Sequence, residues 1–161
     1  MSAPQPVRIV LSHPAGWIAS GFGAGLSPRA PGTVGSLLAL LPWWLLVRPL
    51  SLPIQLLVLA IAFGIGVWAA NWVIAKTGIA DPSVVVWDEF VGLWIALLLV
   101  PAGWPWLLAG FALFRLFDIW KPWPVSWADQ KLHGGFGVML DDMFAGLYAL
   151  LILQATAWLA R

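Results

Sequence analysis

The acidic side chains of this 161-residue chain are confined to one stretch, between residues 81 and 142. They are Asp81, Asp88, Glu89, Asp118, Asp129, Asp141 and Asp142. Most of them lie inside or at the ends of strongly apolar segments, where a carboxylate is costly unless it is paired, protonated or bound to a cation. This placement indicates a functional site, and a bound metal ion is the simplest explanation for it.

Five of these acids are candidate metal ligands and catalytic residues. They are Asp88, Glu89, Asp118, Asp141 and Asp142. The chain has no Cys and only two His, so oxygen must supply most of the ligands. Hard oxygen ligands select magnesium over softer metals, with manganese as the alternative. The competing interpretation is that these acids pair with Arg or Lys of neighbouring helices or, for Asp141 and Asp142, cap a helix.

The other two acids favour structural roles. Asp81 is followed by Pro82, a pair typical of the first residues of a helix, and this predicts a helix start at that point. Asp129 lies in the polar stretch 126–131. We therefore predict that Asp129 is a solvated loop residue outside the site.

Two cations and a histidine are candidates for binding a phosphate group. Arg115 and Lys121 flank Asp118, and the planar guanidinium of an arginine binds phosphate oxygens bidentately. The alternative is an ion pair between Arg115 and Asp118, three residues apart on one helix, with Lys121 neutralising the end of that helix. His133 precedes glycines that would let backbone amides approach an anion at a helix N-terminus.

Residues 1–33 are rich in glycine and proline and contain too many helix breakers for a helix, so they are predicted to form an ordered loop. The end of this loop and the segment after it supply the hydroxyl groups of Ser27, Thr33 and Ser36, beside free backbone amides. These three residues are candidate ligands for a phosphate or a lipid headgroup. A turn-and-cap role is the alternative.

The elements that must position these residues are apolar helices. The chain is 61% hydrophobic and 9% charged and contains 13 Trp, a composition typical of integral membrane proteins. We predict an all-α fold, a single membrane-embedded domain over residues 1–161 with a bundle of about four to five apolar helices. The expected helices cover residues 34–47, 52–74, 82–100, 104–120 and 138–159. The first is short for a span, and many Trp lie near the expected helix ends, as interfacial anchors do.

The distribution of Lys and Arg predicts the orientation of this bundle. If the N-terminus is cytoplasmic, six cations lie on the cytoplasmic side and two outside, in line with the preference of Lys and Arg for cytoplasmic loops. The six are Arg8, Arg29, Lys76, Arg115, Lys121 and Lys131, and the two are Arg48 and Arg161. The acids then lie at helix ends on the cytoplasmic face. A net charge of +1 without a basic run indicates no nucleic-acid partner.

Four motifs taken together resemble the phosphatidylglycerophosphatase A family. They are Gly-x-Gly-Leu-Ser-Pro-x-Ala-Pro-Gly-Thr-x-Gly-Ser (23–36), Asp-Pro-x-x-x-Val-x-Asp-Glu (81–89), Phe-Arg-x-Phe-Asp-x-x-Lys-Pro-x-Pro (114–124) and Gly-Gly-x-Gly-Val-Met-x-Asp-Asp (134–142). The resemblance implies a magnesium-dependent, multi-pass phosphatase of the bacterial inner membrane with its active site facing the cytoplasm. It implies the hydrolysis of the phospholipid phosphatidylglycerophosphate to phosphatidylglycerol and inorganic phosphate, a step of phospholipid biosynthesis.

Our mechanistic hypothesis is direct attack of water on phosphorus at one or two magnesium ions held by the five candidate acids, with Arg115 and Lys121 steadying the phosphate. Two other classes of protein remain as alternatives. A cation or proton transporter would also use buried carboxylates, but near mid-bilayer and on a path to both faces. A non-catalytic membrane subunit has no need of an acid cluster. The sequence leaves an oligomer open.

Overall fold

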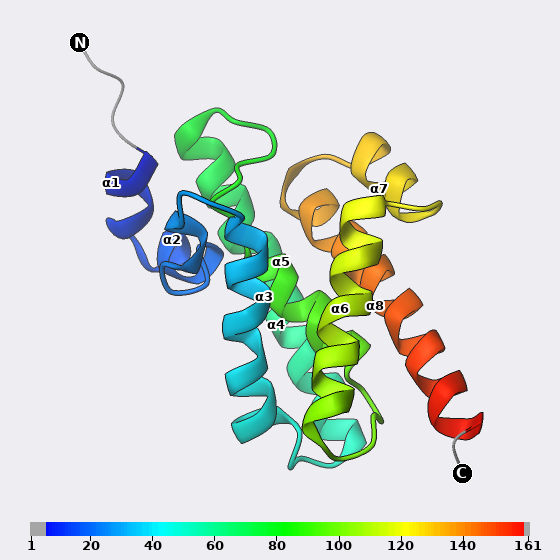
Figure 1. Cartoon of the computed structure of the whole chain (residues 1–161). Helices are drawn as coiled ribbons and strands as arrows, with labels where there is room; N and C mark the ends of the chain where they lie inside the picture. The colour runs from blue at the N-terminus through cyan, green and yellow to red at the C-terminus, as the bar shows by residue number, and fades with distance from the viewer. Residues whose placement is uncertain (1–5, 160–161) are drawn as a thin grey trace.

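The chain folds into helices alone, as predicted. The computed structural model describes residues 6–159, and among them there are eight α-helices and no β-strand (Figure 1). In chain order they are α1 (Pro6–Leu11), α2 (Pro14–Ala19), α3 (Pro31–Pro42), α4 (Leu52–Thr77), α5 (Trp87–Ala96), α6 (Trp104–Trp120), α7 (Val125–Lys131) and α8 (Gly134–Leu159). A 3₁₀ turn, η1 (Ala24–Leu26), precedes α3, and a π-helical segment, η2 (Trp43–Val47), continues it.

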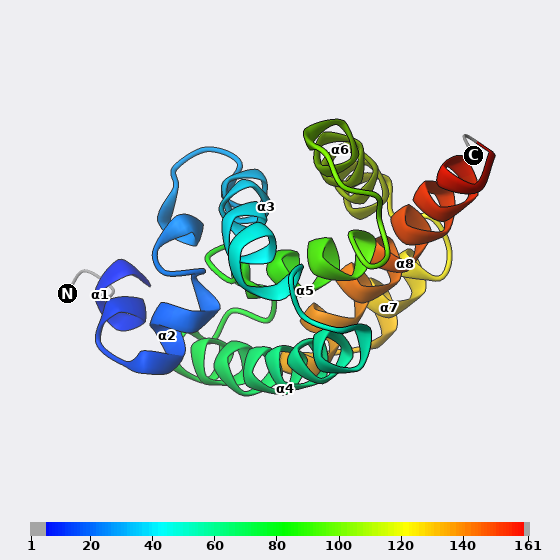
Figure 2. The ribbon, with the colours of Figure 1, turned by 90° about the horizontal axis from the view of Figure 1, so that it is seen from below.

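The short helix α5 lies at the centre of the bundle. Seen along the bundle, α3, α4, α6 and α8 surround it (Figure 2), and every residue from 89 to 98 is buried. This corrects the third expected helix, 82–100, because α5 is only about 15 Å long against a hydrocarbon core of about 30 Å. The segment before α5 is not helical, since the Val86 N–H donates to the Ala19 carbonyl oxygen at 2.8 Å. After α5, Leu99 adopts a left-handed φ of 57°.

Two glycines allow α5 and α8 to touch along their backbones. A Cβ at Gly146 would collide with the carbonyl oxygen of Gly92, and a Cβ at Gly92 would lie 2.7 Å from the carbonyl oxygen of Asp142. Small residues at such crossings permit the close approach that stabilises helix pairs. The crossing brings the start of α5, with its two acids, beside Asp142 of α8.

Two short helices replace much of the loop predicted for residues 1–33. α1 begins at Pro6 and α2 has Pro14 in its first turn, where the missing N–H of proline costs nothing. His13 caps α2, because its Nδ1 accepts a backbone N–H of the first turn at 3.1 Å. These prolines therefore start helices rather than break them. Residues 1–5 of the predicted loop lie outside the described residues.

The last helix begins earlier than expected. α8 starts at Gly134 rather than at residue 138, so the glycines lie inside its first turns and not ahead of them. The Gly135 N–H donates to Oδ1 of Asn71 in α4 at 2.7 Å, and it is not free to bind an anion. Asp141 and Asp142 consequently lie about two turns inside α8. They are buried side chains and not caps of the helix.

The remaining helices match the prediction closely and run alternately up and down. α4 and α6 cover the expected segments 52–74 and 104–120, and α3 with η2 covers 34–47. As a result, five helix ends meet at one end of the bundle, which is the upper end in Figure 1. They are the starts of α3, α5 and α8 and the ends of α4 and α6. Among the described residues, α4 and α8 are the two helices long and apolar enough to cross a membrane.

Candidate active site

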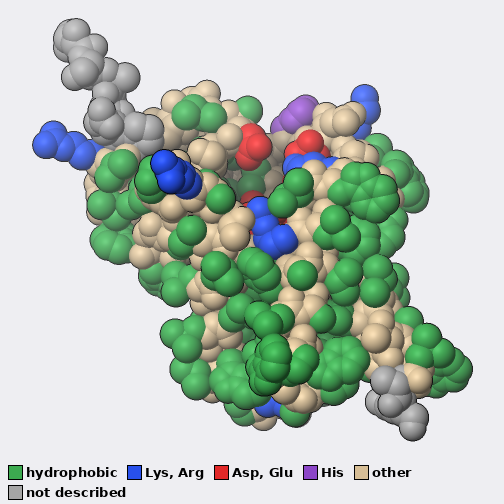
Figure 3. All heavy atoms as spheres, viewed as in Figure 1, with side chains coloured by type: hydrophobic (Ala, Val, Ile, Leu, Met, Phe, Trp, Pro, Cys, Tyr) green, Lys and Arg blue, Asp and Glu red, His purple; other side chains and the backbone are tan. Residues whose placement is uncertain are grey.

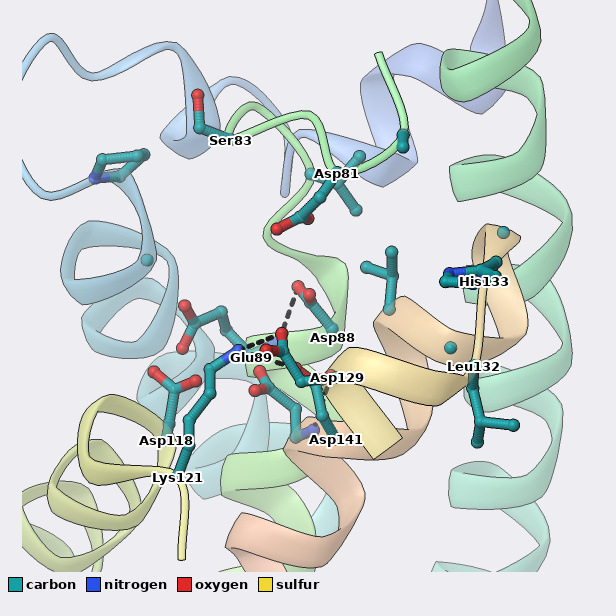
Figure 4. A pocket seen from close by; sticks show the side chains of 18 of the residues that line it. Asp81, Ser83, Asp88, Glu89, Asp118, Lys121, Asp129, Leu132, His133 and Asp141 are labelled. Carbon is teal, nitrogen blue, oxygen red and sulfur yellow. Dashed lines mark hydrogen bonds and ion pairs between the residues drawn. The ribbon is translucent and has the colours of Figure 1, made fainter. Parts of the chain in front are cut away.

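All seven acidic side chains of the chain line one cavity at the upper end of the bundle (Figure 4). The cavity has a volume of about 430 Å³. It is bounded by α3, α5, α6, α7 and α8 and by the loop between α4 and α5, and Arg115, Lys121 and His133 also line it. The structure thus brings together the acids that the sequence places at separate helix ends.

Burial divides this cavity into a base and a mouth. Asp142, Glu89 and Asp141 are 3%, 7% and 8% exposed and form the base. Asp81 and His133 are exposed and lie at the mouth. In Figure 3, acidic, basic and histidine side chains gather around a hollow at the upper end, whereas most of that face below it is hydrophobic. A charged group entering from the mouth would therefore meet buried carboxylates.

Arg115 ties two acids of neighbouring helices together. Its Nη1 forms ion pairs with Oε2 of Glu89 and with Oδ2 of Asp118, the second at 2.7 Å. The ion pair with Asp118 is the alternative that the sequence left open for Arg115. Its Nε is buried and has no hydrogen-bond partner among the described residues. A guanidinium has five N–H donors, so Arg115 retains donors for a phosphate oxygen.

The three predicted hydroxyl ligands, Ser27, Thr33 and Ser36, are not among the residues that line the cavity. Ser36 is fully buried behind Glu89, and its Oγ lies 2.7 Å from Oε2 of Glu89 and 2.8 Å from the carbonyl oxygen of Gly32. Ser36 thus contacts the Glu89 carboxylate from the side away from the cavity. The Ser27 hydroxyl donates to a backbone carbonyl of its own loop at 2.9 Å. Thr33 does not line the cavity either.

Lys121 connects α6 with α7 and α8. Its Nζ lies 2.5 Å from Oδ1 of Asp129 and 3.0 Å from Oδ2 of Asp141. Burial opposes its positive charge, but the hydrogen bonds and charges of Asp129 and Asp141 outweigh this effect and hold the pKa of Lys121 above its usual value. Asp129 is exposed, as predicted, but it lies in α7 rather than in a loop, and it lines the cavity.

Asp129 and Asp81 line the cavity from elements that the sequence did not predict. α7 has only seven residues. The sequence feature that could have predicted it is the pair Val125 and Ala128, which are three residues apart and fully buried. Asp129 lies next to the buried face that this pair forms and not on it. Asp81 does not start a helix, because α5 begins at Trp87. Asp81 lies instead in the loop that borders the cavity mouth, together with the hydroxyl group of Ser83.

The cavity is lined by carboxylate oxygens, which are the type of donor that hard divalent cations prefer. Oδ2 of Asp142 is buried without a hydrogen-bond partner among the described residues, which is costly unless a cation neutralises it. Oδ1 of Asp88 accepts the next backbone N–H at 3.0 Å, which leaves its second oxygen for a cation. As placed, no three His, Cys, Asp or Glu in the described part of the chain are grouped closely enough to hold a metal ion. Arg115 and Lys121 instead pair with four of the acids.

Comparison with known proteins identifies the family. The family model for phosphatidylglycerophosphatase A matches residues 17–157. Phosphatidylglycerophosphatase A of Escherichia coli is 44% identical over 91% of this chain and 85% of its own length, and that of Haemophilus influenzae is 43% identical over 96% of both. A putative phosphatidylinositol-3-phosphatase of Bacteroides thetaiotaomicron is 46% identical over 88% of this chain and 92% of its own length. No solved structure matches the chain significantly. The chain therefore belongs to the phosphatidylglycerophosphatase A family and is a phosphatase, as its four motifs predict.

Proposed function

We propose that this protein is a magnesium-dependent lipid phosphatase that hydrolyses phosphatidylglycerophosphate to phosphatidylglycerol and inorganic phosphate. The observation that carries the proposal is the meeting of all seven carboxylates, Arg115 and Lys121 around one cavity in a chain of this family. The names of the Escherichia coli and Haemophilus influenzae relatives support the substrate. The lipid product, phosphatidylglycerol, is itself an anionic phospholipid, so the reaction belongs to phospholipid synthesis.

The charge of the cavity supports a role for a bound cation. Seven carboxylates against Arg115 and Lys121 leave a formal charge of −5 on the lining when all are ionised and His133 is neutral. A phosphomonoester carries a charge of about −1.5 to −2 at neutral pH, so an uncompensated cavity would repel it. Magnesium would be held by the candidate acids Asp88, Glu89, Asp118, Asp141 and Asp142. When bound, it would neutralise the phosphoryl oxygens and the charge that develops during transfer.

The residues of the chain have separate tasks in this reaction. Arg115 and Lys121 bind the phosphate oxygens and orient phosphorus toward the base of the cavity. A cavity carboxylate accepts a proton from the attacking water as the water oxygen bonds to phosphorus. The bond between phosphorus and the glycerol oxygen breaks, and that oxygen takes up a proton to give phosphatidylglycerol, with inorganic phosphate as the second product. Ser36 holds Glu89 in place from behind. The buried base of the cavity limits the access of other water molecules.

The surface of the bundle supports insertion in a membrane. Apolar side chains are exposed on the outer faces of α3, α4, α6 and α8, including Leu37, Leu41, Leu56, Leu57, Ile61, Leu108, Leu116, Leu147 and Leu151. Such a surface is unfavourable in water and suits hydrocarbon. Exposed Trp side chains lie at both ends of the bundle, as in membrane-interface belts: Trp44, Trp104 and Trp158 at the lower end and Trp120, Trp123 and Trp127 at the upper end. We infer a multi-pass protein of the bacterial inner membrane in which these four helices span the bilayer around α5.

We further propose that the cavity faces the cytoplasm, which is the orientation that the distribution of Lys and Arg predicts. We expect a cysteine at Gln130, on α7 at the cavity end, to react with a membrane-impermeant maleimide only after the inner membrane is broken. A cysteine at Ser51, at the opposite end and also exposed, should react in intact spheroplasts. The native chain contains no Cys, so each variant has a single reactive thiol and the two variants are matched controls for each other. Reaction at position 130 in intact spheroplasts would contradict the orientation. Of the two cations that this orientation places outside, Arg161 lies beyond the described residues.

Gly32 provides a test of the geometry of the acid cluster. In the first turn of α3, a Cβ at this position would collide with Oε1 of Glu89 and lie 3.0 Å from Nη1 of Arg115. We expect Gly32→Ala to fold normally and to release phosphate about tenfold to a hundredfold more slowly, because small displacements of catalytic groups have effects of this size. Gly64→Ala is the control, since a Cβ at Gly64 meets nothing within 4 Å. Equal activity of the two variants would show that the ion pair tolerates displacement.

Ion translocation is the remaining alternative, and the position of the acids opposes it. A transport path requires polar groups toward both ends of the bundle. A second cavity, of about 340 Å³, lies at the opposite end, and its lining, which includes Trp43, Arg48 and Gln55, contains no acidic residue. The acids therefore mark one end of the molecule and not a path through it.

The experiment that tests the proposed substrate compares three lipids. Purified protein in detergent with magnesium should release phosphate from phosphatidylglycerophosphate faster than from phosphatidic acid or phosphatidylinositol 3-phosphate. The third lipid is included because of the name of the Bacteroides thetaiotaomicron relative. Faster release from phosphatidylinositol 3-phosphate would assign that lipid as the substrate. Absence of release from all three would contradict the proposed function.

A further inference from the structure

The ion pairs of Lys121 span three helices. Lys121 follows the last residue of α6, and its ammonium group contacts Asp129 of α7 at 2.5 Å and Asp141 of α8 at 3.0 Å (Figure 4). Asp141 is 8% exposed and belongs to the base of the cavity. The Asp129 side chain is about one-third exposed. The ammonium group is therefore held between a buried carboxylate of α8 and a more exposed carboxylate of α7.

The backbone around Lys121 is held in an unusual conformation. Lys121 has φ 48° and ψ 56°, a left-handed conformation that residues other than glycine seldom adopt without surrounding support. The support comes from α7 and α8. Val125 and Ala128 are fully buried, and the Tyr148 hydroxyl of α8 donates to the carbonyl oxygen of Trp123 at 2.6 Å. Asp129 is thus attached to a well-packed helix and not to a loose loop.

The number of N–H donors on the Lys121 ammonium group determines whether it can also bind a phosphate. A lysine ammonium has three N–H donors, and two are directed at Asp129 and Asp141. The third donor remains for a phosphate oxygen. With Asp141 as its only acidic partner, the long and flexible side chain would no longer be fixed in direction, because a single ion pair leaves it free to rotate.

We propose that Asp129 is a positioning residue, which fixes the direction of the Lys121 ammonium group so that its third donor meets the phosphate of the substrate. The proposal rests on the proposed function, because it assigns α7 a task in that same site. Asp129 acts through Lys121 and does not touch the reacting atoms. It follows that Asp129 has no effect of its own once Lys121 is absent.

A double-mutant cycle tests this inference directly. We expect Asp129→Asn to lower kcat/KM for phosphatidylglycerophosphate about tenfold and Lys121→Gln to lower it more, since hydrogen bonds to charged groups contribute to this extent. The double variant should match Lys121→Gln, because two residues that act as one unit are not additive. Gln130→Ala, an exposed neighbour on α7 outside the cavity lining, is the control and should keep wild-type activity.

A binding measurement separates this inference from the choice of substrate. The same four proteins and the wild type are titrated with inorganic phosphate in detergent and magnesium chloride, without turnover. Asp129→Asn should weaken phosphate binding about tenfold in the wild-type background and not in the Lys121→Gln background. An equal loss in both backgrounds would overturn the inference, because Asp129 would then act independently of Lys121. Unchanged phosphate affinity in Asp129→Asn would overturn it as well, whereas a failure of the three-lipid assay alone affects only the proposed substrate.

Discussion

Replacing Asp142 by Asn is expected to slow phosphate release from phosphatidylglycerophosphate by about a hundredfold or more. Asp142 is 3% exposed, its backbone lies against α5 at the Gly92–Gly146 crossing, and its Oδ2 has no hydrogen-bond partner among the described residues. An amide of the same shape cannot neutralise a cation. The transition state therefore loses its charge stabilisation, which is measured as kcat and kcat/KM at saturating magnesium.

Folding should not suffer in this variant. Removing one charge from a cluster of buried carboxylates relieves their mutual repulsion, so Asp142→Asn should be extracted in normal amounts and melt at or above the wild-type temperature in the absence of metal. We expect losses of the same order for neutral isosteres of Asp88, Glu89, Asp118 and Asp141. Near-normal turnover in two or more of the five variants would refute the assignment of these acids to the reaction.

Removal of the metal is expected to abolish activity and to lower thermal stability. A cation that binds the folded protein alone stabilises it by about 2.7 kcal/mol at a concentration one hundred times its dissociation constant. The melting temperature in detergent should therefore rise as magnesium is added and fall to its starting value with EDTA. The shift should be much smaller in Asp88→Asn and Asp142→Asn. A melting temperature that does not respond to magnesium in the wild type, or responds equally in the variants, would contradict a metal site in this cavity.

The long helices were predictable from the sequence because apolar length and flanking turn residues define them. α6 begins and ends where its apolar segment does, and α4 ends close to its expected last residue, before Gly78 with φ 70°. The short elements were not predictable in the same way. Proline at the start of α1 and α2 is indistinguishable from a breaker when the helix after it has six residues. Because Val86 hydrogen-bonds to Ala19, α5 begins only at Trp87, and no local sequence pattern predicts that tertiary contact.

The site was predictable to a similar degree. The carboxylates were recognised because acids in apolar segments are costly, and the structure places them around one cavity. The role of Ser36 was not predictable, because its partner Glu89 is far away in sequence and the two meet only after α3 packs on α5. Asp129 was misplaced for a different reason. Its stretch is polar by composition, and only the packing of Val125 and Ala128 against α8 turns it toward Lys121.

The most direct test of the central claim is the product balance of purified protein acting on phosphatidylglycerophosphate in detergent micelles with magnesium. Phosphatidylglycerol and inorganic phosphate are counted for the wild type and for Asp142→Asn prepared in parallel. The account predicts one phosphatidylglycerol and one phosphate for each substrate molecule consumed by the wild type, at a rate about a hundredfold or more above that of the variant. Absence of both products from the wild type, or the same rate in both preparations, would contradict it.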